Sequence, residues 1–206
     1  MGITAEDAAE LERCVAVGGL VLFPADTVYG LACDPSSRPA VERLYAMKGR
    51  AGDRPAAVMF FQLEALARTL PELGERARAA LTALLPGPVT AVVPNPERRF
   101  PLAAGPEPER LGVRVPALPP ALGALRSVAA PLLQSSANPS GEPDARRLED
   151  VDAEVRAGVD LELDGGELPG APSTVVDLSA FEETGEWAIR REGAVAAARV
   201  AELLRR

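Results

Sequence analysis

A single lysine stands among the chain's cationic residues. Lys48 is one of 22 basic residues, and all the others are arginines. It lies in the run Tyr45-Ala46-Met47-Lys48-Gly49-Arg50. An ammonium group is a compact, mobile point charge, whereas a guanidinium is a planar fork, so a retained lysine suggests chemistry that a fork cannot serve. Chance in an arginine-rich chain, or a basic residue that complements a helix end, explains the same observation, and Lys48 alone does not decide between these readings.

The absence of histidine narrows the possible chemistry. No histidine occurs in the 206 residues, which excludes a Ser/His/Asp triad and most catalytic zinc sites. The formal net charge of −8 argues against a large nucleic-acid footprint, which needs a basic stripe. A small anionic substrate in a local arginine pocket remains compatible, because net charge says little about one cleft.

Other polar residues that could do chemistry fall at the predicted ends of strands. Neither a Walker-type nor a GxGxxG phosphate loop is present, so a nucleotide would have to be bound in another way. Each polar segment taken singly is explained as a turn or as a packed arginine stem. The segments are Asp26 to Gly30, Lys48 to Arg50, Arg114 within Gly-Val-Arg-Val-Pro, Ser135 to Asn138, Ser173-Thr174 and Arg191.

Alternating helices and strands must position these residues. Thr4 with Asp7 predicts the start of a helix, and the spacing of Val41, Leu44 and Lys48 predicts another helix that stops at Gly49. Apolar runs predict a mixed α/β sheet, and we expect one domain over residues 1–206. Further helices are predicted over about 75–85 and 195–204, strands over 20–23, 57–61, 89–93, 111–115, 132–135, 159–163, 174–178 and 187–190, and loops over 94–110 and 138–147.

Composition also bears on compartment. No apolar run approaches the roughly 20 residues of a membrane span, and the acidic start is unlike a signal peptide, so we expect a cytoplasmic protein with no membrane contact. Cys14 and Cys33 lack CxxC spacing, which favours buried free thiols.

The combined order of motifs resembles the YrdC-like threonylcarbamoyl-AMP synthase family from about Gly18 to Gly193. This resemblance implies an α/β fold in which a YrdC-like twisted mixed sheet with flanking helices lines a large concave cavity. The motifs are FPADTVYGLACD (23–34), KGR (48–50), PGPVT (86–90), GVRVP (112–116), SSANPSG (135–141), STVVD (173–177) and RREGA (190–194).

The resemblance implies a nucleotidyltransferase, an L-threonylcarbamoyladenylate synthase. Its substrates would be L-threonine, bicarbonate or CO2, and ATP accompanied by Mg²⁺, with no tightly bound cofactor and no dedicated metal site. Its products would be threonylcarbamoyl-AMP and pyrophosphate, and partner threonylcarbamoyl-transfer proteins would use the adenylate to modify tRNA, with weak tRNA contact at most.

The resemblance also implies roles for matched positions. Tyr29 suits either the wall of the cavity or the core, and we favour the wall. The implied catalytic residues are Lys48, Arg50, Ser136 and Asn138. The implied threonine-binding residues are Thr27, Arg114, Gln134 and Ser173, and the implied ATP-binding residues are Arg50, Arg54, Ser136, Asp144 and Arg191.

The chain departs from the family pattern at several of these motifs. Ala25 stands where the family usually has threonine, and the segment 53–56 reads Asp-Arg-Pro-Ala in place of Asn-Lys-Pro-Leu. Met59 stands near a position where some members have histidine, and Asp144 replaces a common serine. The cationic set is unchanged by these departures.

Two alternatives belong to other functional classes. One is an RNA-binding paralogue of the same fold without synthase activity, which the acidic balance and the scarcity of Trp and Tyr disfavour. The other is a carbamoyltransferase-like relative, similar to domains within larger hydrogenase-maturation proteins.

Overall fold

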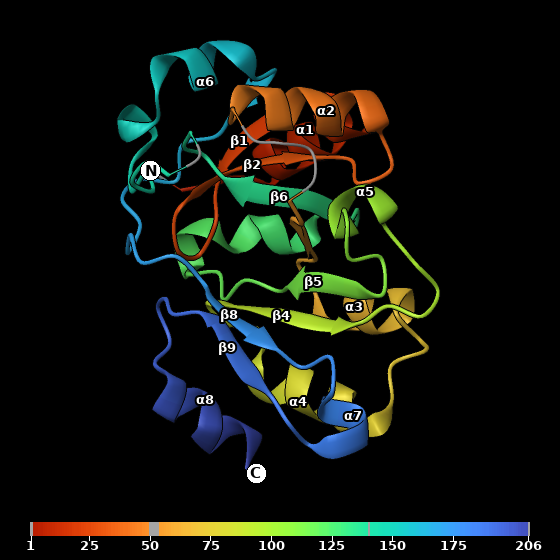
Figure 1. Cartoon of the computed structure of the whole chain (residues 1–206). Coiled ribbons are helices and arrows are strands. Elements are labelled where there is room, and N and C mark those ends of the chain that lie inside the picture. The colour runs from red at the N-terminus through yellow and green to blue at the C-terminus, as the bar shows by residue number, and fades with distance from the viewer. Residues whose placement is uncertain (1, 50–53, 140, 206) are drawn as a thin grey trace.

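The computed structural model describes residues 2–49, 54–139 and 141–205. Within these ranges one mixed sheet of nine strands runs through the molecule in the order β7-β1-β2-β6-β3-β5-β4-β8-β9 (Figure 1). The strands are β1 Val21–Pro24, β2 Tyr29–Cys33, β3 Ala57–Met59, β4 Val89–Pro94, β5 Arg110–Arg114, β6 Leu132–Ser136, β7 Leu161–Glu162, β8 Thr174–Asp177 and β9 Ala188–Arg191.

Helices lie near both ends of this sheet. Figure 1 shows α2 and α6 near the β1–β2 end of the sheet and α4, α7 and α8 near the β8–β9 end. The α-helices are α1 Ala5–Ala16, α2 Arg38–Met47, α3 Leu63–Thr69, α4 Glu75–Leu84, α5 Pro101–Ala104, α6 Ala153–Gly158, α7 Phe181–Thr184 and α8 Ala197–Leu204, and the 3₁₀ helices are η1 Pro120–Ser127 and η2 Leu148–Asp150.

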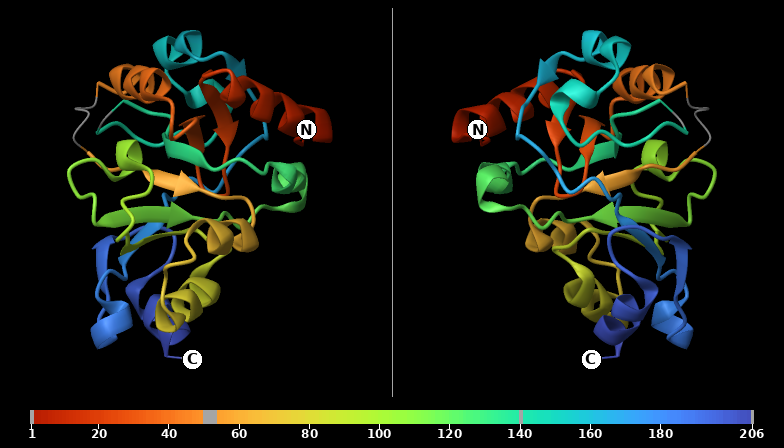
Figure 2. Two further views of the ribbon diagram at one scale, coloured as in Figure 1. Left: turned by 90° about the vertical axis from the view of Figure 1, so that its right-hand side faces the viewer. Right: turned by 90° about the vertical axis from the view of Figure 1, so that its left-hand side faces the viewer.

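Strands that are far apart in the sequence lie side by side. β3 pairs in parallel with β5 and antiparallel with β6, so it is inserted between segments that follow it in the chain. At one edge β8 pairs in parallel with β4 and antiparallel with β9. The two side views of Figure 2 show these C-terminal strands beside β4, away from α1 and α2. The predicted α/β mixed sheet with flanking helices is therefore confirmed.

Local sequence signals explain where the first two helices begin and end. Thr4 and Asp7 form a reciprocal capping box at the start of α1, as predicted. Ser37 caps α2, and Lys48 is the C-cap residue of this helix. Gly49 follows with φ of 55°, a left-handed conformation that glycine adopts at little cost. Lys48 is thereby fixed at the point where the chain leaves the helix.

Some elements differ from the sequence-based expectation. β2 was not predicted, because its five residues are buried throughout and show no alternation of apolar and polar side chains. β1 extends to Pro24, which was expected to end the strand. A proline is accepted there because it is the last residue of the strand, where a ladder donor is least needed. The expected loop over 94–110 contains the single turn α5.

Two further expectations concern buried side chains. Cys14 and Cys33 are both free, and burial raises the pKa of the Cys33 thiol to about 12. Tyr29 is completely buried and is not among the residues lining the cavity described below. Its hydroxyl donates to Asp164 Oδ1 at 2.9 Å and accepts from the Gly165 N–H at 3.0 Å. The preference for a wall position was therefore wrong, since this hydroxyl anchors the segment after β7.

No helix in the described ranges is both long enough and apolar enough to cross a membrane.

Asp160, next to β7, supplies an acid-sensitive contact between β7 and β1. It forms an ion pair with Arg43 at 2.9 Å and accepts a hydrogen bond from the Leu20 N–H at 2.7 Å. The Arg43 bond and the Leu20 bond hold the pKa of this carboxyl below its usual value. Because the folded-state pKa lies below the unfolded one, the stabilisation is complete above about pH 4 and is lost as the pH falls.

Asp160→Asn should therefore lower the free energy of unfolding by about 1 kcal/mol at pH 7, a value reduced for the partial exposure of the pair. Urea titrations at pH 7 and near pH 3 check this, since the gap between variant and wild type should shrink in acid. Glu183→Gln, at an exposed position, serves as the control. A gap that stays constant with pH would contradict the assignment.

Candidate active site

A cavity of about 530 Å³ opens on one face of the central strands. Side chains on β5 explain how the sheet builds its wall, because Arg110, Gly112 and Arg114 alternate along the strand and so share one face. Thr90 and Val92 on β4 line the cavity in the same way. Lys48, Arg54, Arg114, Gln134, Ser136, Asn138, Asp144, Ser173 and Arg191 also line the cavity, so most of the predicted site residues meet there.

Two small residues, Gly112 and Ala57, lie side by side on the strands that line this cavity. Gly112 on β5 is the register partner of Ala57 on β3 and of Val92 on β4, and Ala57 is in turn the partner of Gln134 on β6. All four residues line the cavity. The small volume of Gly112 and Ala57 leaves room for a ligand against the sheet, while polar groups, including Gln134 in the same row, surround it.

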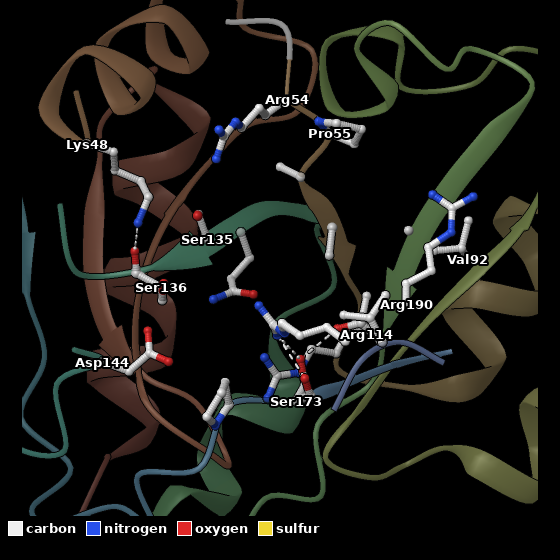
Figure 3. A pocket seen from close by; sticks show the side chains of 18 of the residues that line it. Lys48, Arg54, Pro55, Val92, Arg114, Ser135, Ser136, Asp144, Ser173 and Arg190 are labelled. Carbon is white, nitrogen blue, oxygen red and sulfur yellow. Dashed lines mark hydrogen bonds between the residues drawn. The ribbon is translucent and has the colours of Figure 1, made fainter. Parts of the chain in front are cut away.

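Lys48 lies at one end of the cavity, and only 4% of its surface is exposed. Its Nζ donates to the backbone carbonyl oxygens of Ser136 and Asn138, the latter at 2.6 Å. Figure 3 shows the ammonium directed from the end of α2 toward Ser136. An ammonium with three tetrahedrally arranged donors can serve these converging oxygens, which a planar guanidinium cannot match.

The segment that Lys48 grips carries two more predicted residues. Ser136 Oγ donates to Asn138 Oδ1, which lies 3.4 Å from Lys48 Nζ. The Asn138 side-chain amide donates to the carbonyl oxygen of Glu142. These bonds hold the turn after β6 in one shape, with Ser136 half-buried at the cavity wall.

Arg114 occupies another part of the wall, and its residue surface is 3% exposed. Its Nη2 donates to Asp26 Oδ1 and, at 2.6 Å, to Thr27 Oγ1. Its Nε is the single buried side-chain nitrogen or oxygen in the described part of the chain without a hydrogen-bond partner. Thr27 is itself buried and contacts Arg114 from outside the cavity lining, so its direct contact with a ligand stays a prediction.

Ser173 and Arg191 meet at the β8–β9 side of the cavity. Arg191 Nη2 donates to the Ser173 carbonyl oxygen at 2.8 Å and approaches Ser173 Oγ at 3.3 Å. Ser173 Oγ also pairs with Thr90 Oγ1 at 2.9 Å. Figure 3 shows Ser173 and Arg114 close together. Two predicted residues that are far from Arg114 in sequence therefore line the same cavity as its guanidinium.

Three further predicted residues, Gln134, Arg54 and Asp144, also line the cavity. Gln134 is 6% exposed and stands on the β6 row beside Ala57. The Arg54 side chain points toward the hollow in Figure 3, and Asp144 lies on the side of Ser136. Arg50 lies outside the described residues, as does Asp53.

Several residues in the cavity wall or directly behind it were not singled out from the sequence. Asp26 was noted only as part of a motif, yet its side chain is 3% exposed and pairs with Arg114. Thr90 was likewise unassigned. A charged group at the rim comprises Glu107, Arg110 and Arg190, with Asp177 joined to Arg190 at 2.7 Å. Desolvation opposes the charged form of Arg190, but the hydrogen bonds and negative charges of Asp177 and Glu107 together outweigh it and raise the arginine's pKa. The sequence signal that could have identified Asp26 is the presence of an acidic residue at the tip of an otherwise apolar hairpin.

A bound metal would need clustered ligands. Across residues 2–49, 54–139 and 141–205, no group of three or more Cys, Asp or Glu side chains is arranged to hold a metal ion. The described lining of the cavity offers cations, hydroxyls and amides, together with the carboxylates of Glu107, Glu142 and Asp144. Such a set defines a class of protein that binds small anionic ligands against one face of a twisted mixed sheet.

Comparison with known proteins identifies the family. The model named Sua5_yciO_yrdC, described as "Telomere recombination", matches residues 13–193, and the chain belongs to this family. A threonylcarbamoyl-AMP synthase from Chromohalobacter salexigens is 36% identical over 181 residues, which are 87% of this chain and 96% of that protein. One from Hahella chejuensis is 31% identical over 185 residues, covering 88% of this chain and 97% of the relative.

Solved structures agree with this assignment. The crystal structure of P. abyssi Sua5 complexed with L-threonine superposes with a TM-score of 0.85 at 29% sequence identity. The match covers 98% of this chain and 58% of that one, so the archaeal protein is considerably longer than the part it shares.

Proposed function

We propose that this chain is an L-threonylcarbamoyladenylate synthase, which makes threonylcarbamoyl-AMP and pyrophosphate from L-threonine, bicarbonate or CO2, and ATP. The observation that carries the proposal is the convergence of Lys48, Arg54, Arg114 and Arg191 on one cavity. The names of the synthase relatives, and the relative complexed with L-threonine, support this activity over an RNA-binding role.

The proposed reaction has two bond-forming steps. The threonine nitrogen bonds to the carbon of bicarbonate with loss of water, which gives N-carboxythreonine. An oxygen of this new carboxylate then bonds to the α-phosphorus of ATP, while the bond to the β-phosphate oxygen breaks and pyrophosphate leaves. The site must therefore hold two carboxylates and a triphosphate together.

Fixed cations make that crowding feasible. Two like charges about 4 Å apart repel by about 4 kcal/mol at an effective dielectric of 20. Lys48, with Ser136 and Asn138, would stabilise charge on the phosphates and the carbamate from one end of the cavity. Arg50 is proposed to act with Lys48, and Arg54, Asp144 and Arg191 would contact ATP. Catalysis is then chiefly alignment and charge stabilisation, which needs no protein base.

The threonine is proposed to bind around Arg114. A guanidinium matches a carboxylate through two parallel hydrogen bonds, and Arg114 lines the cavity while Asp26 and Thr27 hold its Nη2. Ser173 and Gln134 lie close enough to the same wall to bind the amino group or the side-chain hydroxyl. Thr27 would contribute by orienting Arg114, with or without a direct contact.

Mg²⁺ is proposed to enter with ATP as part of the substrate. The adenylate would pass to threonylcarbamoyl-transfer proteins that modify tRNA. The chain's own contact with tRNA would be weak, because its formal charge is −8.

The direct test is pyrophosphate release by the purified chain. Release from ATP and Mg²⁺ should require both threonine and bicarbonate, since the attacking carboxylate does not exist without both. Mass spectrometry with labelled bicarbonate should find the label in threonylcarbamoyl-AMP. Equal release with serine, or none with any amino acid, would overturn the proposal, and retention of unmodified tRNA on filters at two salt concentrations would favour the RNA-binding alternative.

Lys48→Arg tests the need for an ammonium. The fork cannot meet the oxygens of Ser136 and Asn138 in the same space, so the rate of pyrophosphate release should fall by about 100-fold. Arg199→Lys, on the exposed face of α8, is the matched exchange and should retain the wild-type rate. Wild-type activity in Lys48→Arg would return Lys48 to a helix-end role.

Arg114→Lys separates the two anion sites. It keeps a positive charge beside Asp26 but loses the fork, so the KM for threonine should rise by about tenfold or more while the KM for ATP changes little. Arg114→Ala should act in the same direction with a larger loss of stability, because it leaves Asp26 buried without a partner. A larger effect on the KM for ATP would mean that Arg114 serves the nucleotide.

A further inference from the structure

Asp26 lies at the tip of the β1–β2 hairpin, behind Arg114. Its carboxylate uses both oxygens, because Oδ1 accepts from Arg114 Nη2 and Oδ2 accepts from the Ala117 N–H at 2.8 Å. One bond is to a side chain and the other to backbone just beyond β5. The plane of the carboxylate is therefore fixed relative to the strand that carries Arg114.

The neighbouring residue completes this grip. Thr27 Oγ1 accepts from the same Nη2 atom of Arg114 at 2.6 Å, and the Thr27 carbonyl oxygen accepts from the Gly170 N–H at 2.9 Å. The hairpin tip is closed by a bond from the Ala25 N–H to the Val28 carbonyl oxygen at 3.3 Å. The acceptors on Nη2 thus sit in a tethered turn, which leaves the guanidinium little freedom to rotate.

Burial gives this arrangement a strong energetic preference. The side chains of Arg114 and Asp26 are 4% and 3% exposed, so neither charge has much contact with water. A buried charge without its partner costs several kcal/mol. The paired arrangement of Arg114 and Asp26 is therefore strongly favoured over any arrangement that separates the two charges. Nε of Arg114 nevertheless has no acceptor in the described ranges. Because this Nε is enclosed by protein atoms, other atoms of the Arg114 side chain form its part of the cavity wall.

We infer that Asp26 is a positioning residue that sets threonine recognition by holding Arg114, through its Nη2, in the orientation in which the arginine lines the cavity. This inference rests on the proposed function, because it takes the carboxylate of threonine as the partner of Arg114. Asp26 itself does not line the cavity and would act only through the arginine. It also offsets the guanidinium charge, so recognition depends on the direction of the donors more than on net attraction.

The test compares Asp26→Asn with a matched carboxylate elsewhere. Threonine and ATP kinetics are measured by pyrophosphate release, threonine affinity by calorimetry without ATP, and stability by thermal unfolding. Asp26→Asn should raise the Kd and the KM for threonine about 10- to 100-fold, since small misplacements of a binding group have effects of this size, and leave the KM for ATP within about twofold. Asp26→Glu keeps the charge but not both bonds, and should show the same selective loss.

Glu72→Gln is the control. Glu72 pairs with Arg99 at 2.8 Å away from the cavity, and the substitution should lower stability without changing either KM. Should Asp26→Asn fail to fold, Asp26→Glu carries the test. An unchanged Kd for threonine in a folded Asp26 variant, or equal changes in both KM values, overturns the inference. A wild-type chain that lacks threonine-dependent activity overturns the proposed function itself.

Discussion

Among the described residues, the two buried cations that line this cavity depend on oxygen atoms from segments far away in the sequence. The ammonium of Lys48 is surrounded by oxygens of Ser136 and Asn138, about 90 residues later, and the guanidinium of Arg114 is held by Asp26 and Thr27, almost as far before it. Because a buried charge is tolerated only with such partners, these contacts constrain how the hairpin tip, the end of α2 and the turn after β6 are arranged.

The sheet turns this constraint into a binding surface. Alternation along β5 places Arg110, Gly112 and Arg114 on one face, and the register with β3 and β4 puts Ala57 and Val92 beside the glycine. As a result, the middle of the cavity floor has little side-chain volume, and charged side chains line the cavity around it. Large apolar side chains fill the opposite face, as the complete burial of Val58, Val113 and Leu133 shows. One set of strands thereby supplies a core on one side and a polar hollow on the other.

The features that could be predicted from the sequence are those that depend on a few neighbouring residues. Capping at Thr4, the stop at Gly49 and most strands agree with their patterns, because these depend on neighbouring residues. β2 was missed since a strand buried on both faces has no period of two. The motif resemblance anticipated most of the predicted side chains that line the cavity, whereas Thr27 lies behind Arg114 and Arg50 lies outside the described residues. It did not anticipate Asp26 as the partner of Arg114 or the rim group around Glu107, since such pairings follow from the order of strands in space.

The order of strands also bears on when the cavity can exist during synthesis. β3 lies between β5 and β6, and β8 and β9 add Ser173 and Arg191 only at the outer edge beside β4. A nascent chain that has emerged as far as β6 has Lys48 and Arg114 but lacks the opposite wall. A ligand that needs Ser173 and Arg191 thus cannot bind completely during synthesis until the segment 173–191 has left the exit tunnel.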